Sequence, residues 1–210
     1  MIISKKIDKI KNPFKFSKIK KIKIKSQLNK NYQFDNFIES DGNQFARNVG
    51  FFVAENIDKN PFNPLFIYGD VATGKTHLVQ AIGNEIKKRF SKKNVLYVSA
   101  EILTRQYINS VKKNEQDEFI RFYQLIDVLI VEDLQFLAGK SSTQNIFIQM
   151  YNYLHQKKKL IIFTADKAPI EMEDIEQQLL SRFKCSLPVE LKKPNKKRKA
   201  CDQLKKKAMM

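Results

Sequence analysis

The feature that most constrains this chain is a short run of residues between an apolar stretch and a helical pattern. The run is Gly69-Asp70-Val71-Ala72-Thr73-Gly74-Lys75-Thr76. It follows the apolar residues 65–68 and precedes apolar residues at 78, 79, 82 and 86, which recur at helical spacing. Strand, glycine-bearing loop and helix in this order are typical of a phosphate-binding P-loop, in which backbone N–H groups face the phosphates, the lysine reaches their oxygens and the hydroxyl binds Mg²⁺. The alternative is a chance glycine turn before an amphipathic helix.

A second motif lies downstream, where the apolar residues 128–131 end in Glu132 and Asp133. Continuous hydrophobicity with β-branched residues favours a parallel strand that is buried on both faces. Acids at the carboxyl end of such a strand stand where open α/β sheets bind ligands. One carboxylate would hold Mg²⁺ and the other would orient or activate the attacking water, so the pair is a Walker B candidate. A strand followed by an acidic turn remains the alternative.

The composition fits one globular domain with short appendages, since the chain has 210 residues, of which 42% are hydrophobic and 29% charged. No stretch approaches about 18 uncharged apolar residues, and the N-terminus lacks the apolar block of a secretory signal. A cytoplasmic protein without a membrane span is therefore expected. The cysteines Cys185 and Cys201 and the histidines His77 and His155 have no metal-ligand spacing, which argues against a zinc site or a cysteine–histidine nucleophile.

The net charge of +17 is concentrated at the two ends of the chain. Residues 1–30 hold eleven lysines and one aspartate, and residues 192–210 hold nine basic residues and one aspartate, so the middle is close to neutral. Blocks of like charge are commonly solvated and disordered. They also attract phosphate backbones, and each phosphate neutralised on duplex DNA steepens the salt dependence by about 0.9 in log–log slope. Both interpretations stay open, as does an AT-rich coding sequence as the source of the lysines.

The middle of the chain alternates strand patterns with helix patterns. Strands are expected at 65–68, 95–99, 128–131 and 160–164, and helices at 44–55, 75–89, 101–113, 115–125 and 143–156. A short helix at 175–181, a strand at 185–189 and a basic helix after residue 194 follow. The alternation predicts an α/β fold with a parallel sheet flanked by helices. The expected domains are a basic, disordered tail at 1–30, a nucleotide-binding domain at 31–191 and a basic segment at 192–210.

Several segments in order permit a more specific identification. They are Tyr32-Gln-Phe-Asp-Asn-Phe37, Asn63-Pro-Leu-Phe-Ile-Tyr-Gly69, Gly74-Lys-Thr-His77, Asp127-Val-Leu-Ile-Val-Glu-Asp133 with Gln135-Phe136, and Ser181-Arg-Phe183. Over residues 28–208 they resemble the AAA+ domain of the DnaA family of bacterial chromosomal replication initiators. The resemblance implies a P-loop NTPase (AAA+) fold with only the first helix of the lid subdomain. It also implies ATP and Mg²⁺ as cofactors and ATP-dependent assembly of a homo-oligomer on origin DNA.

The resemblance assigns nucleotide-site roles position by position. Residues 69–76 match the phosphate loop, with Lys75 on the phosphates and Thr76 on Mg²⁺. Glu132 shares the metal, and Asp133 completes the Walker B pair. Asp166 matches sensor 1, which reads the γ-phosphate, although on local sequence alone it fits a turn equally well.

Further roles come from the same resemblance. Arg182 matches the arginine finger that reaches into the ATP site of a neighbouring subunit, whereas its local sequence favours an ordinary surface arginine. Phe34, Asn36 and Phe37 match the N-terminal box over the nucleotide; as isolated aromatics, the two phenylalanines would be core residues. Ile108 matches an apolar residue at the family's contact to single-stranded DNA. Ser142 occupies the place of a basic residue in that contact, which weakens the expectation.

Several departures from the family pattern bear on activity. Asp70 and Ala72 replace two loop glycines, and they introduce an acid beside the phosphates and a residue that resists positive φ. Glu132 is one methylene longer than the usual aspartate, and Gln178 replaces an arginine at subunit contacts. ATP binding is therefore expected, with weak ATPase activity at best.

The expected function is that of a DnaA-like, ATP-binding replication initiator that assembles on origin DNA in its ATP state. No match to the family's duplex-reading helix-turn-helix domain is present, so DNA binding is expected to be non-sequence-specific or single-stranded. A replicative helicase or its loader is a candidate partner. Two alternatives stay open: a stand-alone AAA+ adaptor or regulator, and a basic nucleic-acid binder with a decayed P-loop.

Overall fold

A parallel sheet of five strands in the order β2-β3-β4-β1-β5 forms the centre of the domain. The computed structural model describes residues 24–193. The strands are β1 (Leu65–Tyr68), β2 (Val95–Ser99), β3 (Val128–Glu132), β4 (Leu160–Ala165) and β5 (Leu187–Glu190). All residues of β3 and β4 are buried, which is why these strands read as unbroken apolar runs in the sequence.

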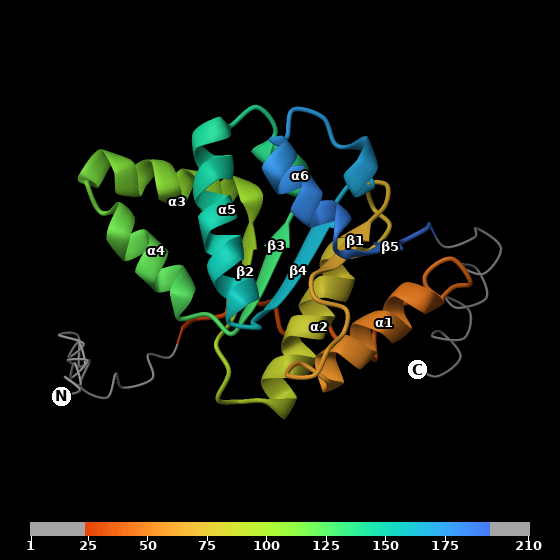
Figure 1. The fold of residues 1–210 in the computed structure, drawn as a ribbon. Coiled ribbons are helices and arrows are strands. Elements are labelled where there is room, and N and C mark those ends of the chain that lie inside the picture. The colour runs from red at the N-terminus through yellow and green to blue at the C-terminus, as the bar shows by residue number, and fades with distance from the viewer. Residues whose placement is uncertain (1–23, 194–210) are drawn as a thin grey trace, which may run out of the picture.

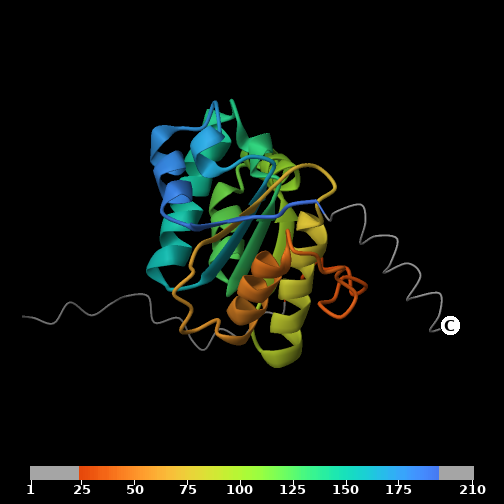
Figure 2. The same cartoon turned by 90° about the vertical axis from the view of Figure 1, so that its right-hand side faces the viewer.

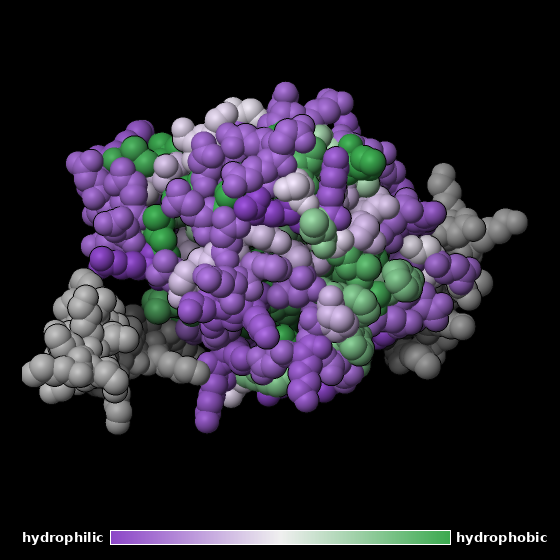
Figure 3. Space-filling model, in the orientation of Figure 1, coloured by the Kyte–Doolittle hydropathy of each residue, from purple (hydrophilic) through white to green (hydrophobic). Residues whose placement is uncertain are grey.

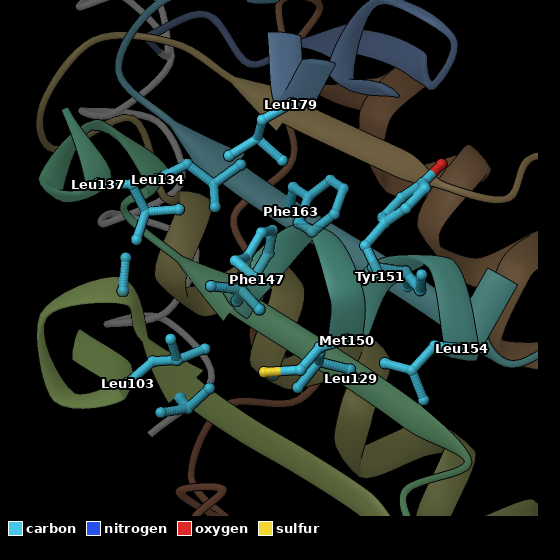
Figure 4. Packing of buried hydrophobic residues seen from close by; sticks show 14 of the residues in the cluster. Leu103, Leu129, Leu134, Leu137, Phe147, Met150, Tyr151, Leu154, Phe163 and Leu179 are labelled. Carbon is cyan, nitrogen blue, oxygen red and sulfur yellow. The ribbon is translucent and has the colours of Figure 1, made fainter. Parts of the chain in front are cut away.

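Helices cover both faces of the sheet (Figures 1 and 2). The helices are α1 (Gln44–Glu55), α2 (Lys75–Arg89), α3 (Ala100–Lys113), α4 (Gln116–Gln124), α5 (Ser141–Gln156) and α6 (Gln177–Lys184). The first two helices pack with one apolar layer, and the other four contribute to a second layer. In Figure 4, Phe147 and Met150 of α5 lie with Phe163 and Leu129 of the sheet in this second layer. Because all five strands are parallel, their carboxyl ends lie at the same edge of the sheet, between the two layers of helices.

The α/β fold predicted from the sequence is confirmed, and most element boundaries agree within two residues. The helix expected at 175–181 instead spans Gln177–Lys184, because Leu179, Leu180 and Phe183 bury its apolar face. The last strand begins later than predicted, at Leu187. Two short 3₁₀ helices, η1 (Leu134–Leu137) and η2 (Pro169–Glu171), were not predicted because runs this short carry no periodic signal. The basic helix expected after residue 194 lies outside the described residues.

The start of the described chain packs on the domain, although residues 1–30 were expected to form a tail. The carbonyl of Ser26 accepts a hydrogen bond from the Tyr97 amide of edge strand β2 at 2.9 Å. The Asn29 amide donates to Gln80 Oε1 at 2.8 Å. Leu28 lies so close to Gly83 that a Cβ added there would meet its side chain at 2.8 Å. Residues 24–30 thus form an N-terminal strap across β2 and α2, and the remainder of the expected tail lies outside the described residues.

The surface facing the viewer in Figure 3 is mostly hydrophilic, with separate apolar areas between charged side chains. Exposed apolar side chains include Phe45, Phe52 and Ile108. Within residues 24–193, the helices are too short or too polar to cross a bilayer.

Candidate nucleotide-binding site

The loop between β1 and α2 has three residues with positive φ: Gly69 at 154°, Ala72 at 62° and Gly74 at 104°. A Cβ added to Gly69 would lie 2.2 Å from the Leu191 carbonyl oxygen, so this position requires glycine for space as well as for φ. Ala72 adopts the left-handed conformation that the sequence predicted it would resist, at a cost of about 1–2 kcal/mol. The substitution therefore does not prevent the left-handed conformation at this position of the loop.

A cavity of about 490 Å³ opens above this loop at the carboxyl edge of the sheet. Its walls are residues 71–77, Tyr32, Asp133, Gln135, Phe136 and Asp166. The first turn of α2 faces the cavity, and amide groups in a first helical turn have no carbonyl partner within their own helix. Such a helix N-terminus attracts phosphate oxygens.

Asp70 is the loop residue that the sequence predicted to oppose a triphosphate. Its side chain does not line the 490 Å³ cavity, and it is 77% exposed. The carboxylate lies 3.5 Å from Lys193 Nζ and lines a separate cavity of about 240 Å³ behind the loop. Because the acid points outward and has a cationic neighbour, its repulsion of phosphate is screened.

Lys75 is buried, and its ammonium group contacts three oxygens. Nζ donates to the Gly69 carbonyl at 2.6 Å, to the Asp70 carbonyl at 3.0 Å and to Asp166 Oδ1 at 2.8 Å. The other Asp166 oxygen accepts from Gln135 Nε2 at 2.8 Å. The predicted sensor 1 residue thus lies against the predicted phosphate-binding lysine, and a phosphate entering the cavity would compete for that lysine.

The two predicted Walker B acids occupy different environments at the end of β3. Glu132 is buried and accepts hydrogen bonds from the hydroxyls of Thr76 and Tyr97. Burial raises the pKa of its carboxyl group above the usual range. Asp133 adopts φ 60°, and its amide donates to Thr164 Oγ1 at 3.1 Å. Burial, with the charge of Asp166 adding to it, also raises the pKa of Asp133.

The oxygen donors at this point suit a small hard cation. Thr76 supplies a hydroxyl from α2, and Glu132 supplies a carboxylate from β3, already in mutual contact. Mg²⁺ prefers oxygen ligands and is commonly held by one or two protein groups together with water and nucleotide phosphates. When bound, it would neutralise charge on the β- and γ-phosphates. The donor set therefore fits the predicted metal site.

Two of the three predicted N-terminal box residues contact His77, which lines the cavity. Phe37 stacks edge-on against His77 with ring centroids 5.2 Å apart, and Asn36 Oδ1 lies 3.0 Å from His77 Nε2. Tyr32 also contacts the His77 ring, at a centroid distance of 4.9 Å. Phe34 packs in the core against Phe51, and none of Phe34, Asn36 and Phe37 lines the cavity itself.

Arg182 and Ile108 do not line the nucleotide cavity. Arg182 Nε donates to Asn152 Oδ1 at 2.9 Å, and its guanidinium lies over the Tyr151 ring at 5.7 Å. Ile108 is 45% exposed on α3. Both residues therefore lie outside the nucleotide cavity of their own chain.

The structure adds Tyr32, His77, Gln135 and Tyr97 to the residues that build the site. His77 directly follows Thr76 and Gln135 lies two residues after Asp133, so nearness to predicted site residues was the available signal. The hydroxyl of Tyr97 gave no signal, because an aromatic residue in an apolar strand pattern is expected in the core.

Comparison with known proteins agrees with this geometry. The profile of the bacterial DnaA ATPase domain matches residues 28–190. The chain is 54% identical over 193 residues to the chromosomal replication initiator protein DnaA of Flavobacterium psychrophilum, an alignment that covers 92% of this chain and 40% of that protein. The chain thus spans well under half the length of this relative.

Two solved structures are similar in fold. Domain III of the Thermotoga maritima replication initiation protein DnaA superposes with a TM-score of 0.78 at 35% identity, covering 81% of this chain and 70% of that one. A replication initiator DnaA bound to AMPPCP and single-stranded DNA has a TM-score of 0.76 at 40% identity, covering 80% of this chain and 51% of that one.

Proposed function

Because the chain belongs to the bacterial DnaA ATPase domain family, we propose that it binds ATP with Mg²⁺ and acts as an ATP-controlled module in the initiation of chromosomal DNA replication. The observation that carries the proposal is the convergence of Lys75, Thr76 and Glu132 at one cavity, at the carboxyl edge of a parallel sheet. This is where a P-loop NTPase holds the β/γ-phosphates and the metal.

ATP binding is supported by the conformation of the loop between β1 and α2. The left-handed conformation of Ala72 and the outward direction of Asp70 preserve the cavity in spite of two substitutions. A similar DnaA structure contains AMPPCP, an ATP analogue. We assign the phosphates to Lys75, the metal to Thr76 and Glu132, and the γ-phosphate contact to Asp166.

DNA binding is proposed to be non-sequence-specific or single-stranded for this chain. Ile108 is exposed on α3, and a DnaA structure 40% identical to this chain holds single-stranded DNA. The basic flanks at 1–30 and 192–210 are proposed to add phosphate contacts around the domain at 31–191.

Assembly in the ATP state is proposed to use Arg182. Its guanidinium lies outside its own nucleotide cavity and is held over Tyr151. A planar, permanently charged guanidinium suits the γ-phosphate of a neighbouring subunit. A replicative helicase or its loader is the proposed partner class. The structure of the DnaC helicase loader, at 16% identity, shares only the fold.

Hydrolysis is proposed to be slow. Asp133 is the residue proposed to activate the attacking water, because both carboxylate oxygens of Glu132 already accept hydrogen bonds from hydroxyl groups. Slow hydrolysis suits a switch, because the ATP state then persists long enough to assemble.

A direct test titrates a fluorescent ATP analogue against wild type and Lys75→Ala, with Lys88→Ala at the far end of the same helix as the control. DNA binding by the same proteins is then measured with ATP and with ADP across a salt series. The proposal predicts that only Lys75→Ala loses nucleotide binding and the ATP-dependent part of DNA binding. Nucleotide binding without any DNA dependence would favour the adaptor alternative. Unchanged DNA binding by Lys75→Ala would favour the decayed P-loop.

A further inference from the structure

The Tyr97 hydroxyl reaches the metal-site carboxylate from edge strand β2. In the parallel register, Tyr97 pairs with Ile130 of β3, two residues before Glu132. Residues two apart on a strand point to the same face of a sheet, so Tyr97, Ile130 and Glu132 share a face. A long aromatic side chain can reach such a diagonal neighbour.

Three elements converge on the Glu132 carboxylate. Thr76 from the first turn of α2 donates to Oε1, and Tyr97 from β2 donates to Oε2. Each carboxylate oxygen therefore holds one hydroxyl.

The position of Tyr97 is itself fixed. Its amide donates to the Ser26 carbonyl of the N-terminal strap at 2.9 Å, and its ring packs with the apolar layer under α2. The same residue lines a cavity of about 780 Å³ beside α3, where Ile102 and Phe122 form apolar walls. A side chain held at both its backbone and its ring can present the hydroxyl in one place.

We propose that Tyr97 is a positioning residue for Mg²⁺·ATP, whose hydroxyl holds the Glu132 carboxylate beside the Thr76 hydroxyl before the nucleotide arrives. Because a group that is already in place loses no freedom on binding, the hydroxyl strengthens the metal-dependent part of nucleotide affinity. The inference rests on the proposed function, since it concerns the same site. It assigns a role to a residue outside the P-loop and the Walker B motif.

The test measures the affinity of the full chain for a fluorescent ATP analogue, once with excess Mg²⁺ and once with EDTA. Tyr97→Phe removes only the hydroxyl, and Tyr153→Phe on α5 is the matched control. Tyr97→Phe is expected to reduce the gain in affinity given by Mg²⁺ roughly five- to tenfold, which lies within the usual net contribution of one intramolecular hydrogen bond. Its affinity in EDTA should stay within about twofold of wild type, since Tyr97 does not touch the phosphate loop.

A double-mutant cycle with Glu132→Ala identifies the route of the effect. If the hydroxyl acts through Glu132, Tyr97→Phe has no further effect on the Mg²⁺ gain in the Glu132→Ala background. If Tyr97→Phe lowered nucleotide affinity equally in Mg²⁺ and in EDTA, its role would be merely structural and the inference would be overturned. The same conclusion would follow if it lowered the Mg²⁺ gain equally in the wild-type and Glu132→Ala backgrounds. A Tyr97→Phe protein that matches wild type would also overturn the inference. Wild type that binds no nucleotide at all would instead overturn the proposed function.

Discussion

Two lysine–aspartate pairs lie at opposite edges of the same sheet, and they have different surroundings. At the carboxyl edge, Lys75 and Asp166 meet at 2.8 Å beside a 490 Å³ cavity, in a loop with three positive-φ residues. At the amino edge, Lys159 pairs with Asp127, which also accepts the Asn94 amide at 2.8 Å. The first pair borders the 490 Å³ cavity above the loop, whereas the second borders a smaller cavity of about 170 Å³ and joins three chain segments. We propose that the same chemistry serves ligand binding at the carboxyl edge and stability at the amino edge.

The largest expected effect comes from removing the lysine of each pair in turn. Lys75→Ala should lower ATP affinity about a hundredfold or more, because it removes a buried charge from its partner phosphates. Its free energy of unfolding should change by less than about 1 kcal/mol, because the mutation removes the cost of burying an ammonium group and leaves an Asp166 carboxylate that is 36% exposed and still hydrogen-bonded to Gln135. Lys159→Ala should do the reverse, losing about 1–2 kcal/mol of stability with unchanged ATP affinity. Nucleotide titration and urea unfolding of both variants check this; a shared phenotype would erase the distinction.

The amino-edge pair also predicts a pH dependence. Burial alone would raise the pKa of Asp127, but the hydrogen bonds from Lys159 and Asn94 and the Lys159 charge lower it. A carboxyl whose pKa is lowered by folding stabilises the protein above its unfolded pKa and loses that contribution as the pH falls through the folded value. Asp127→Asn should therefore be about 1 kcal/mol less stable than wild type near pH 7, and the gap should close below about pH 4. Urea unfolding across that range measures the gap; a constant gap would contradict the ion pair.

A smaller effect concerns the strain in the loop. Ala72→Gly should raise the free energy of unfolding by up to about 1 kcal/mol, because glycine adopts φ 62° without the steric cost. Ala81→Gly inside α2 is the control, and it should lose about 1 kcal/mol or more because glycine weakens a helix interior and the site is buried. Thermal or urea unfolding distinguishes the two signs. Destabilisation by Ala72→Gly would remove the claim of strain.

The smallest effect is expected at Asp70. Since its carboxylate points away from the phosphate cavity and faces Lys193, Asp70→Asn should change ATP affinity by less than about threefold at physiological salt. Asp166→Asn provides the contrast, because that side chain touches Lys75 directly. An affinity gain of tenfold or more from Asp70→Asn would mean that the acid turns into the cavity when nucleotide binds.

Sequence patterns were sufficient for the fold and for the place of the candidate site in it. The buried runs of β3 and β4 and the helical spacing after Lys75 located the elements that bring Lys75, Glu132 and Asp166 together. Local patterns could not show the direction of the Asp70 side chain, which depends on Lys193 far along the chain. They also missed the contact of Tyr97 with Glu132, because it depends on strand register. The N-terminal strap was hidden by its lysines, whose charges resemble those of a solvated tail.

The most direct test of the central claim is a crystal structure of the chain with Mg²⁺ and a non-hydrolysable ATP analogue. We predict the triphosphate in the 490 Å³ cavity, with Lys75 Nζ on phosphate oxygens instead of the Gly69 carbonyl and the metal between Thr76 and Glu132. An empty cavity at saturating analogue, with Lys75 still bound to Gly69 and Asp166, would contradict the account.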